Sequence, residues 1–298
     1  MNHGGVRSKY NHKAEMKIGI TGAGGQLGRE LSLYLESVGF TVIAFSRQEL
    51  DICNVQLLND TLFKLDLDFL VNCAAFTDVD RAENKPAIAF LTNAEGPANL
   101  AKVCKSKDIG FIHISTDSVF SSDTPEYFKV ANPTNPINVY GLSKDAGEKA
   151  ILKEYPERSW IIRTAWIYGN FGGKFVHTIM EKAEGDKTLS VVDDQFGQPI
   201  STSALASYIS AMVRSEKNPG IYHFASADYV SRFEFAQTIF SILNSDPERV
   251  LPVSTVPANL VAKRPKYSLL DTTESVGSLE IRVQSWKDYL ITFLQKAR

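Results

Sequence analysis

A glycine-rich turn near the start of the chain constrains the fold more than any other feature. The stretch GITGAGGQLGRE follows an apolar run and spaces Gly22, Gly25 and Gly28 three residues apart. A tight turn needs the backbone freedom of glycine, and close approach to a pyrophosphate leaves no room for a Cβ atom. The helix that follows offers free N–H groups at its start. The pattern predicts a dinucleotide-binding turn that includes Gln26 and Leu27, with a simple strand-to-helix turn as the alternative.

Short apolar runs alternate with longer helical stretches along the first half of the chain. This alternation predicts an α/β class: a Rossmann-type doubly wound parallel sheet with a smaller C-terminal substrate lobe. The expected strands cover 17–21, 41–45, 69–75, 110–115 and 160–165. We expect a disordered extension at 1–15, a dinucleotide-binding domain at 16–165 and a mainly substrate-binding lobe at 166–298. A helix near 203–214 is expected to pack back on the first domain.

Charge and cysteine content exclude several classes of function. The 298 residues carry a formal net charge of -2, which offers no broad basic surface for nucleic acid and no polybasic membrane patch. No apolar run approaches the roughly 20 residues of a membrane span, and the first residues lack a secretion signal. The three cysteines, Cys53, Cys73 and Cys104, form no CxxC pair, which favours a reducing cytoplasm over a disulfide framework or zinc site. No metal site is predicted, and His113 is interpreted as a core histidine.

The residues after the expected strand at 41–45 bear on cofactor choice. An NAD-binding protein usually places a carboxylate there, whereas this chain has Ser46 and Arg47. A hydroxyl and a guanidinium can accept a 2′-phosphate, so NADPH is favoured over NADH. The alternative is that Arg47 lies on a solvated loop. By position, Asp51 and Ile52 are expected to bracket the adenine.

On the nicotinamide side of the cofactor, the sequence points to the NCAA tetrad that ends the expected strand at 69–75. By position, Ala74 and Ala75 are expected to line the cofactor there.

The stretch VYGLSK places Tyr140 and Lys144 one helical turn apart. A model tyrosine has a pKa of about 10 and is a reluctant acid at neutral pH. A lysine ammonium on the same helix face is expected to lower the pKa of the Tyr140 phenol and to bind ribose hydroxyls of the cofactor. Thr116, which follows the expected strand at 110–115, supplies a hydroxyl that can hold a reacting carbonyl.

These motifs together resemble the extended short-chain dehydrogenase/reductase superfamily, and within it the dTDP-4-dehydrorhamnose reductases. The resemblance runs from Met16 almost to the C-terminus. It is carried by NCAAFTDVDRAE, STD, NPINVYGLSKDAGEKA, RTAWIYG, DDQFGQP and AKRPKYSLLD. It implies NADPH-dependent reduction of the 4-keto group of a dTDP-4-keto-6-deoxyhexose, most closely dTDP-4-dehydro-L-rhamnose to dTDP-L-rhamnose.

The resemblance also implies residue roles. Tyr140 would donate the proton, Thr116 would hydrogen-bond the carbonyl oxygen, and Asp117 and Trp166 would contact the sugar, with a packed core tryptophan as the alternative for Trp166. The family usually has a tyrosine after the Thr-Asp pair, where this chain has Ser118. The smaller side chain leaves space at the substrate, so the particular 4-keto sugar stays open.

Two other functions on the same fold remain as alternatives. One is a sugar-nucleotide epimerase or dehydratase, although dehydratases carry a glutamate where this chain has Ser118. The other is a non-catalytic regulatory subunit like that of methionine adenosyltransferase, which is free to lose Tyr140 or Lys144. The resemblance further allows a homodimer and a Mg²⁺ ion between subunits, for which the sequence locates no ligands.

Overall fold

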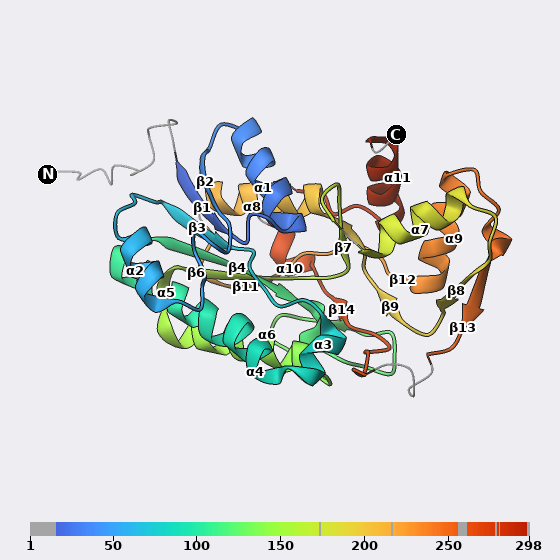
Figure 1. Cartoon of the computed structure of the whole chain (residues 1–298), viewed down its shortest axis with the longest axis horizontal. Helices are drawn as coiled ribbons and strands as arrows, with labels where there is room; N and C mark the ends of the chain where they lie inside the picture. The colour runs from blue at the N-terminus through green and yellow to red at the C-terminus, as the bar shows by residue number, and fades with distance from the viewer. Residues whose placement is uncertain are drawn as a thin grey trace, which may run out of the picture.

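Six parallel strands form the central sheet of the molecule, in the order β11-β6-β4-β3-β1-β2 (Figure 1). The structure is a computed structural model that describes residues 16–172, 174–215, 217–255, 261–277, 279 and 281–296, so the expected extension at 1–15 lies outside the described residues. The strands are β1 (Lys17–Thr21), β2 (Thr41–Phe45), β3 (Phe69–Asn72), β4 (Gly110–Thr116), β6 (Ser159–Thr164) and β11 (Gly220–His223). The predicted Rossmann-type parallel sheet is confirmed.

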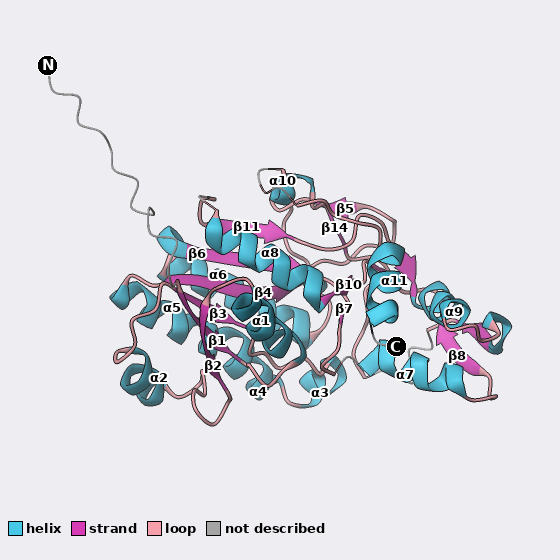
Figure 2. Ribbon diagram, turned by 90° about the horizontal axis from the view of Figure 1, so that it is seen from above, coloured by secondary structure: helices cyan, strands magenta, loops and turns pink. Residues whose placement is uncertain are grey.

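Helices cover both faces of this sheet (Figures 1 and 2). On one face lie α1 (Gln26–Ser37) and α8 (Thr202–Arg214), which pack against each other. The other face is covered by α2 (Val55–Leu62), α5 (Gly96–Lys107) and α6 (Val139–Glu154). A hydrophobic core lies on each face of the sheet, and successive residues of a strand point into one and then the other. Leu70 and Phe111 pack on the α5 side, and Val71 and Ile112 pack on the α1 side. This double burial explains why the strands read as unbroken apolar runs.

The chain between β3 and α5 is a succession of short helical turns. They are α3 (Val79–Asn84), α4 (Pro86–Phe90) and a π-helical turn over Leu91–Glu95. The π-helical turn brings Asn93 against α6, where its side-chain amide donates to the Ser143 hydroxyl at 3.0 Å. The close contact leaves no space for a side chain at Gly147, whose Cβ would overlap the backbone oxygen of Asn93.

A smaller lobe lies at one end of the sheet and contains α7 (Lys174–Glu184), α9 (Arg232–Ile242) and α11 (Trp286–Lys296) (Figure 1). Its strands occur in pairs, among them β8 (Leu189–Val192) with β13 (Val250–Val253) and β9 (Phe196–Gly197) with β12 (Val230–Ser231). Helix α9 begins at a capping box in which Ser231 and Glu234 satisfy each other's backbone N–H groups. Two further pairs are β7 (Ile167–Tyr168) with β10 (Ile200–Ser201), and β5 (Tyr127–Phe128) with β14 (Leu269–Leu270).

Two elements from the second half of the chain pack with the elements of the first half. Strand β11 pairs with β6 as the edge of the sheet, and α8 packs on α1. The division into 16–165 and 166–298 therefore stays a proposal about function and is not a clean cut in the fold. Among the described residues, no helix combines the length and the apolar character needed to cross a bilayer.

Candidate active site

The glycine turn between β1 and α1 has no room for a side chain at Gly22 or Gly28. Gly22 has a φ of 66°, a left-handed conformation, and a Cβ added to it would lie 2.6 Å from the Ala74 backbone nitrogen. A Cβ on Gly28 would overlap the Gly22 carbonyl oxygen. The turn is tied to the end of β2 by a hydrogen bond from Ala23 N–H to the Phe45 carbonyl at 3.1 Å.

The start of α1 suits an anionic group. Its N-cap is Gly25, and no side chain caps the helix, so the first-turn N–H groups are available to an anion. The side-chain nitrogen of Gln26 is buried and has no hydrogen-bond partner among the described residues. A buried donor of this kind calls for an acceptor. The predicted pyrophosphate fits here.

A cavity of about 330 Å³ lies where the carboxyl ends of β1, β4 and β6 meet the glycine turn. Its lining contains many of the residues predicted from sequence: Gly25, Gln26, Leu27, Gly28, Ala75, Thr116, Asp117, Tyr140, Lys144 and Trp166. Ala74 lies behind the lining, against Gly22. Ser118 does not line the cavity but donates its backbone N–H to the Thr116 hydroxyl at 3.1 Å.

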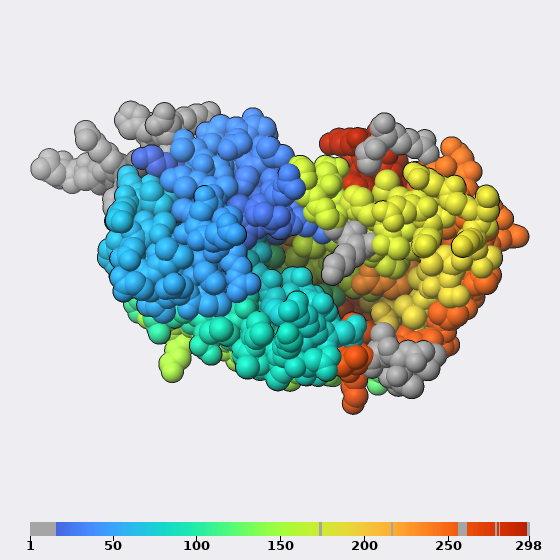
Figure 3. Space-filling model, in the orientation of Figure 1, coloured from blue at the N-terminus to red at the C-terminus, as the bar shows by residue number. Residues whose placement is uncertain are grey.

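A second cavity, of about 590 Å³, continues from the first toward the lobe and shares four lining residues with it: Gln26, Thr77, Trp166 and Ile167. Figure 3 shows a hollow between the blue N-terminal segments and the yellow-green segment of α7. Two arginines, Arg29 and Arg232, line this second cavity. The two cavities together form a groove that runs from the glycine turn to the lobe.

Tyr140, Thr116 and Asp117 form a cluster of polar groups at the floor of the groove. The Thr116 hydroxyl donates to Asp117 Oδ1 at 3.0 Å and also hydrogen-bonds the Tyr140 hydroxyl. Asp117 is buried, accepts a second hydrogen bond from the Ser268 hydroxyl at 2.6 Å, and has a pKa raised by burial. Because a threonine hydroxyl has one proton, Thr116 can donate either to Asp117 or to a group beside Tyr140, but not to both.

The prediction that Lys144 lowers the pKa of Tyr140 is wrong. Burial raises the pKa of the Tyr140 phenol to about 12, and the nearby Asp117 carboxylate raises it further, while the bond to Thr116 only partly opposes these effects. The ammonium is engaged elsewhere: Lys144 Nζ donates to the Ile114 carbonyl at 2.6 Å and lies 3.0 Å from His113 Nε2. Tyr140 therefore keeps its proton at neutral pH, which is the form that a proton donor needs.

Lys144 itself lies deep in the protein, with 1 % of its surface exposed. Burial lowers the pKa of its amine to about 8, against the opposing effect of Glu148, which lies one turn further along α6. Glu148 is in turn held by a buried ion pair with Arg163 of β6, with an oxygen-to-nitrogen distance of 2.6 Å. His113 was correctly expected to be a satisfied core histidine, but the sequence did not reveal that its partner is Lys144.

The start of α6, which carries Tyr140, is fixed by side chains from the motif DVDRAE. Glu83 Oε1 accepts from the Val139 N–H at 2.8 Å, and Asn138 caps the helix by accepting from the Gly141 N–H at the same distance. Asp80 forms an ion pair with Arg264 at 2.9 Å. The acidic residues of this motif therefore anchor α6 and the 262–264 segment.

Arg232 is a candidate site residue that sequence reasoning missed. It stands first in α9, with its guanidinium carbon 3.4 Å from the centroid of the Trp166 ring and 4.8 Å from that of Phe175. The Asp117 carboxylate acts on it electrostatically, although burial lowers its pKa to about 10. Arg232 follows a helix cap in the sequence, where a basic residue carries no specific signal.

The residues predicted to bind the adenosine half lie in and after the turn that follows β2, and none of them lines the 330 Å³ cavity. Arg47 is 81 % exposed at its side chain and pairs with Asp51 at 3.3 Å. The Ser46 N–H donates to Glu49 at 2.8 Å, and Ile52 is buried against Gly96. The predicted contacts of Ser46, Arg47, Asp51 and Ile52 with a cofactor remain predictions.

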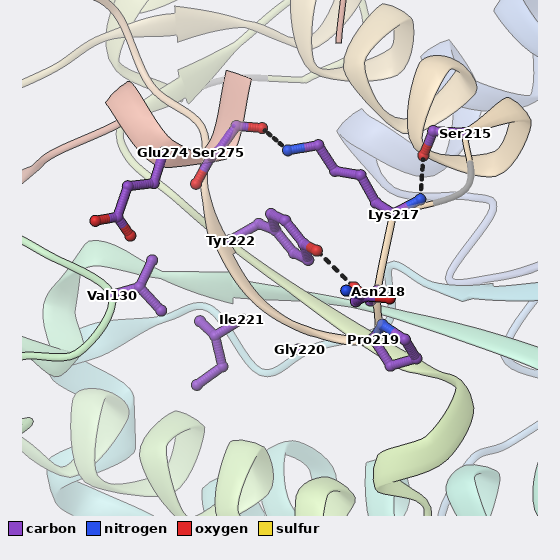
Figure 4. A pocket seen from close by; sticks show the side chains of 10 residues that line it. All are labelled: Val130, Ser215, Lys217, Asn218, Pro219, Gly220, Ile221, Tyr222, Glu274 and Ser275. Carbon is purple, nitrogen blue, oxygen red and sulfur yellow. Dashed lines mark hydrogen bonds between the residues drawn. The ribbon is translucent and has the colours of Figure 1, made fainter. Parts of the chain in front are cut away.

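Another cavity, of about 570 Å³, lies at the edge strand β11 and shares no lining residue with the groove (Figure 4). Its lysine, Lys217, turns to the Ser275 backbone carbonyl at 2.7 Å. No group of three or more His, Cys, Asp or Glu side chains that could hold a metal ion occurs in the described part of the chain. The resemblance to families with Mg²⁺ thus gains no support here.

The parallel sheet has a glycine turn after its first strand, and a threonine, a tyrosine and a lysine line the same cavity as that turn. This combination defines a dinucleotide-dependent oxidoreductase of the short-chain dehydrogenase/reductase type. A family model described as the RmlD substrate binding domain matches residues 16–298. The chain belongs to this family, that of the dTDP-4-dehydrorhamnose reductases.

Individual relatives and solved structures agree with this assignment. The chain is 40 % identical to a dTDP-4-dehydrorhamnose reductase of Mycolicibacterium smegmatis, over 92 % of this chain and 84 % of the relative. It is 37 % identical to a dTDP-4-keto-6-deoxy-D-glucose reductase of Streptomyces niveus, over 88 % and 92 %. The crystal structure of dTDP-4-dehydrorhamnose reductase from Bacillus anthracis in complex with NADP superposes with a TM-score of 0.90 at 34 % identity, over 95 % and 99 % of the two chains.

Proposed function

We propose that this protein reduces the 4-keto group of a dTDP-4-keto-6-deoxyhexose with NADPH, and that its substrate is dTDP-4-dehydro-L-rhamnose, giving dTDP-L-rhamnose. The observation that carries the proposal is that Thr116, Tyr140 and Lys144 line one cavity together with the glycine turn. The family assignment supports the same reaction.

Each residue of the cavity is proposed to have a separate role in the reaction. Bound NADPH supplies the hydride for the carbonyl carbon. Tyr140 donates its proton to the carbonyl oxygen, which gains negative charge, and the Thr116 hydroxyl hydrogen-bonds that oxygen. Lys144 is proposed to bind the ribose hydroxyls of the cofactor through its ammonium group. In the resting arrangement the Thr116 hydroxyl donates its hydrogen bond to Asp117, so it must turn from Asp117 to the carbonyl oxygen when the substrate is bound.

Trp166 is proposed to contact the deoxyhexose, with Arg232 behind its ring. The groove beyond Trp166 contains Arg29 and Arg232, and two guanidinium groups suit the diphosphate of a sugar nucleotide. The neighbouring aromatic side chains of Phe171 and Phe175 offer flat apolar faces in the same cavity.

NADPH is proposed over NADH because Ser46 and Arg47 stand at the end of β2. The NADP complex of the Bacillus anthracis relative favours the same choice. A reducing compartment such as the cytoplasm fits the three free thiols. A homodimer remains part of the proposal on the ground of family resemblance alone.

A direct assay tests the proposal. Purified protein is mixed with NADPH and dTDP-4-dehydrorhamnose, and loss of the reduced-nicotinamide absorbance is followed together with formation of dTDP-L-rhamnose. No turnover above a no-enzyme control would refute the function. NADH is run in parallel, with Arg47→Ala: we expect the variant to lose NADPH efficiency and to keep its NADH rate, with Arg158→Ala as control.

A second 4-keto sugar is included in the assay because of two observations. The relative that reduces dTDP-4-keto-6-deoxy-D-glucose matches almost as well as the rhamnose enzymes, and Ser118 is small. Faster turnover of dTDP-4-keto-6-deoxy-D-glucose would move the assignment to that substrate while leaving the reaction class unchanged.

A further inference from the structure

A row of three polar side chains crosses the sheet face beneath α6. Thr21, Asn72 and His113 stand in register on β1, β3 and β4, and each is at most 1 % exposed. The Thr21 hydroxyl donates to Asn72 Oδ1 at 2.6 Å, and Asn72 Nδ2 lies 2.9 Å from His113 Nδ1. At the end of the row, His113 Nε2 lies 3.0 Å from Lys144 Nζ. A continuous chain of hydrogen bonds thus joins the lysine of the proposed catalytic set to the middle of the sheet.

The direction of these hydrogen bonds follows from one backbone group. Asn72 Oδ1 accepts from the Ala74 N–H at 3.1 Å, and a backbone N–H can only donate. The oxygen of Asn72 must therefore face Ala74, so its NH₂ group faces His113 Nδ1. An amide NH₂ is only a donor, so Nδ1 is the unprotonated acceptor and the imidazole proton is on Nε2.

This tautomer has a consequence for Lys144. The Nε2–H of His113 points at Lys144 Nζ, and an ammonium has no lone pair to accept it. Only the neutral amine can accept from His113 and still donate to the Ile114 carbonyl. The hydrogen bonds of the row are all satisfied when Lys144 is uncharged.

The charged lysine requires a different arrangement of the same groups. An ammonium donates to Nε2, which places the imidazole proton on Nδ1. Asn72 must then turn its oxygen to His113, and its NH₂ group faces the Ala74 N–H, which loses its acceptor. The imidazole is neutral in both arrangements, and one proton leaves the pair when the lysine is deprotonated.

Other charged or titratable groups around Lys144 come from each element packed on it. Glu148 and Tyr140 lie on α6, Cys73 follows β3, and Asp117 follows β4. Glu148 favours the ammonium but is already paired with Arg163. Burial keeps the His113 pKa well below its usual value, so this imidazole does not become charged itself.

We propose that the Thr21–Asn72–His113 row is a positioning device that couples the protonation of Lys144 to the tautomer of His113, with the row favouring the neutral amine. The row thereby sets the pH at which the enzyme loses the charge beside Tyr140. His113 acts through Lys144 and touches neither cofactor nor sugar. The catalytic meaning of this coupling rests on the proposed function, whereas the coupling itself is a property of the folded chain.

Nuclear magnetic resonance of the full-length protein with ¹⁵N-labelled histidine tests the coupling without substrate. Long-range ¹H–¹⁵N spectra between pH 6 and 10 are expected to show His113 changing from the Nδ1–H to the Nε2–H tautomer, with a midpoint within about one unit of pH 8 and no imidazolium signal. Lys144→Met is the matched variant: its His113 should stay as Nε2–H at every pH, because Asn72 alone then sets the tautomer.

The His113 signal is assigned by its loss in His113→Gln, or by single replacement of the other four histidines if that variant does not fold. One unchanging tautomer in the wild-type protein, or the same change in Lys144→Met, overturns the proposal. A protein that shows the tautomer change but does not reduce the sugar nucleotide refutes the proposed function and leaves the coupling intact.

Discussion

The guanidinium of Arg232 stacks on Trp166, which holds a φ of 40°, a left-handed conformation that costs a residue with a side chain on the order of 1–3 kcal/mol. Gly197 packs so closely under the indole that a Cβ there would overlap the ring. The stacked Arg232 guanidinium and the closely packed Gly197 hold Trp166 in this conformation where the two cavities of the groove meet. Its position is therefore imposed by neighbours from two other segments.

Arg232→Lys is expected to loosen Trp166, because a lysine ammonium cannot stack as a flat group between Trp166 and Phe175. A cation–π contact is worth about 0.5–2 kcal/mol, so the KM for the sugar nucleotide should rise about tenfold while that for NADPH stays within about twofold. Arg214→Lys is the control, since Arg214 stacks on Phe40 at 4.4 Å beyond the C-terminal end of α1, the end away from the glycine turn. An equal KM change in both variants would contradict a role for Arg232 at the sugar.

Tyr140→Phe removes the proposed proton donor and leaves the ring. We expect kcat to fall by about 10² to 10⁴, the usual range for positioned proton transfer, with NADPH affinity nearly unchanged in a fluorescence titration. Tyr155→Phe, on the opposite end of α6 with its hydroxyl 3.4 Å from Asp108, should keep full turnover. Retention of most of the activity by Tyr140→Phe would assign the proton donor elsewhere.

The pH dependence of turnover should follow Lys144. Its pKa is about 8 and that of Tyr140 about 12, so in the neutral range the phenol is protonated and the amine is charged. Above pH 8 the charge is lost, and kcat is expected to fall about tenfold per unit of pH. Lys149→Met, which removes an exposed lysine of the same helix, should show the same profile. A kcat that stays flat to pH 9.5 would exclude Lys144 as the group responsible.

The lowered pKa of Lys144 also affects the free energy of unfolding. The unfolded chain binds the Lys144 proton up to about pH 10.5, whereas the folded chain releases it at about 8. Between these values the unfolded state binds more protons, so the contribution of Lys144 to the free energy of unfolding rises with pH. Urea unfolding at pH 7.5 and 9.5 should show this rise in the wild-type protein relative to Lys144→Met.

Gly22→Ala and Gly24→Ala form a matched pair in the glycine turn. At Gly22 the φ of 66° and the Ala74 backbone oppose a methyl group, so we expect a loss of at least roughly 1–3 kcal/mol in the free energy of unfolding. At Gly24 no heavy atom lies within 4 Å of the added Cβ, and the stability should change by less than about 0.5 kcal/mol. Similar losses in the two variants would mean that the turn is not limited by space.

Local patterns were sufficient to predict the sheet and the glycine turn. The expected strands at 17–21 and 41–45 match the structure, and those at 69–75, 110–115 and 160–165 differ by one residue or a few at their ends. These elements depend on neighbours in the sequence: apolar runs for strands buried on both faces, and glycines where a Cβ would collide. The resemblance to a known family supplied the remaining site residues.

Contacts between distant parts of the chain were not predictable from sequence. The partner of Lys144 is His113, 31 residues earlier, and the partner of the Val139 N–H is Glu83, 56 residues earlier. Such pairs depend on strand register and on how α6 crosses the sheet, which no local pattern encodes. For the same reason the pKa of Tyr140 was predicted in the wrong direction. The four-residue spacing along the helix does not show which group the Lys144 ammonium contacts.

The last strand of the sheet, β11, is contributed by residues 220–223, after the part of the lobe that contains α7 has been synthesised. During synthesis, one edge of β6 stays unpaired until about sixty further residues have left the ribosome. A fragment ending near 165 would expose that edge to other chains and invite aggregation. The dinucleotide-binding part of this protein therefore does not form a complete sheet on its own. If residues 16–165 were fused to a different lobe, that lobe would have to supply a strand that pairs with β6.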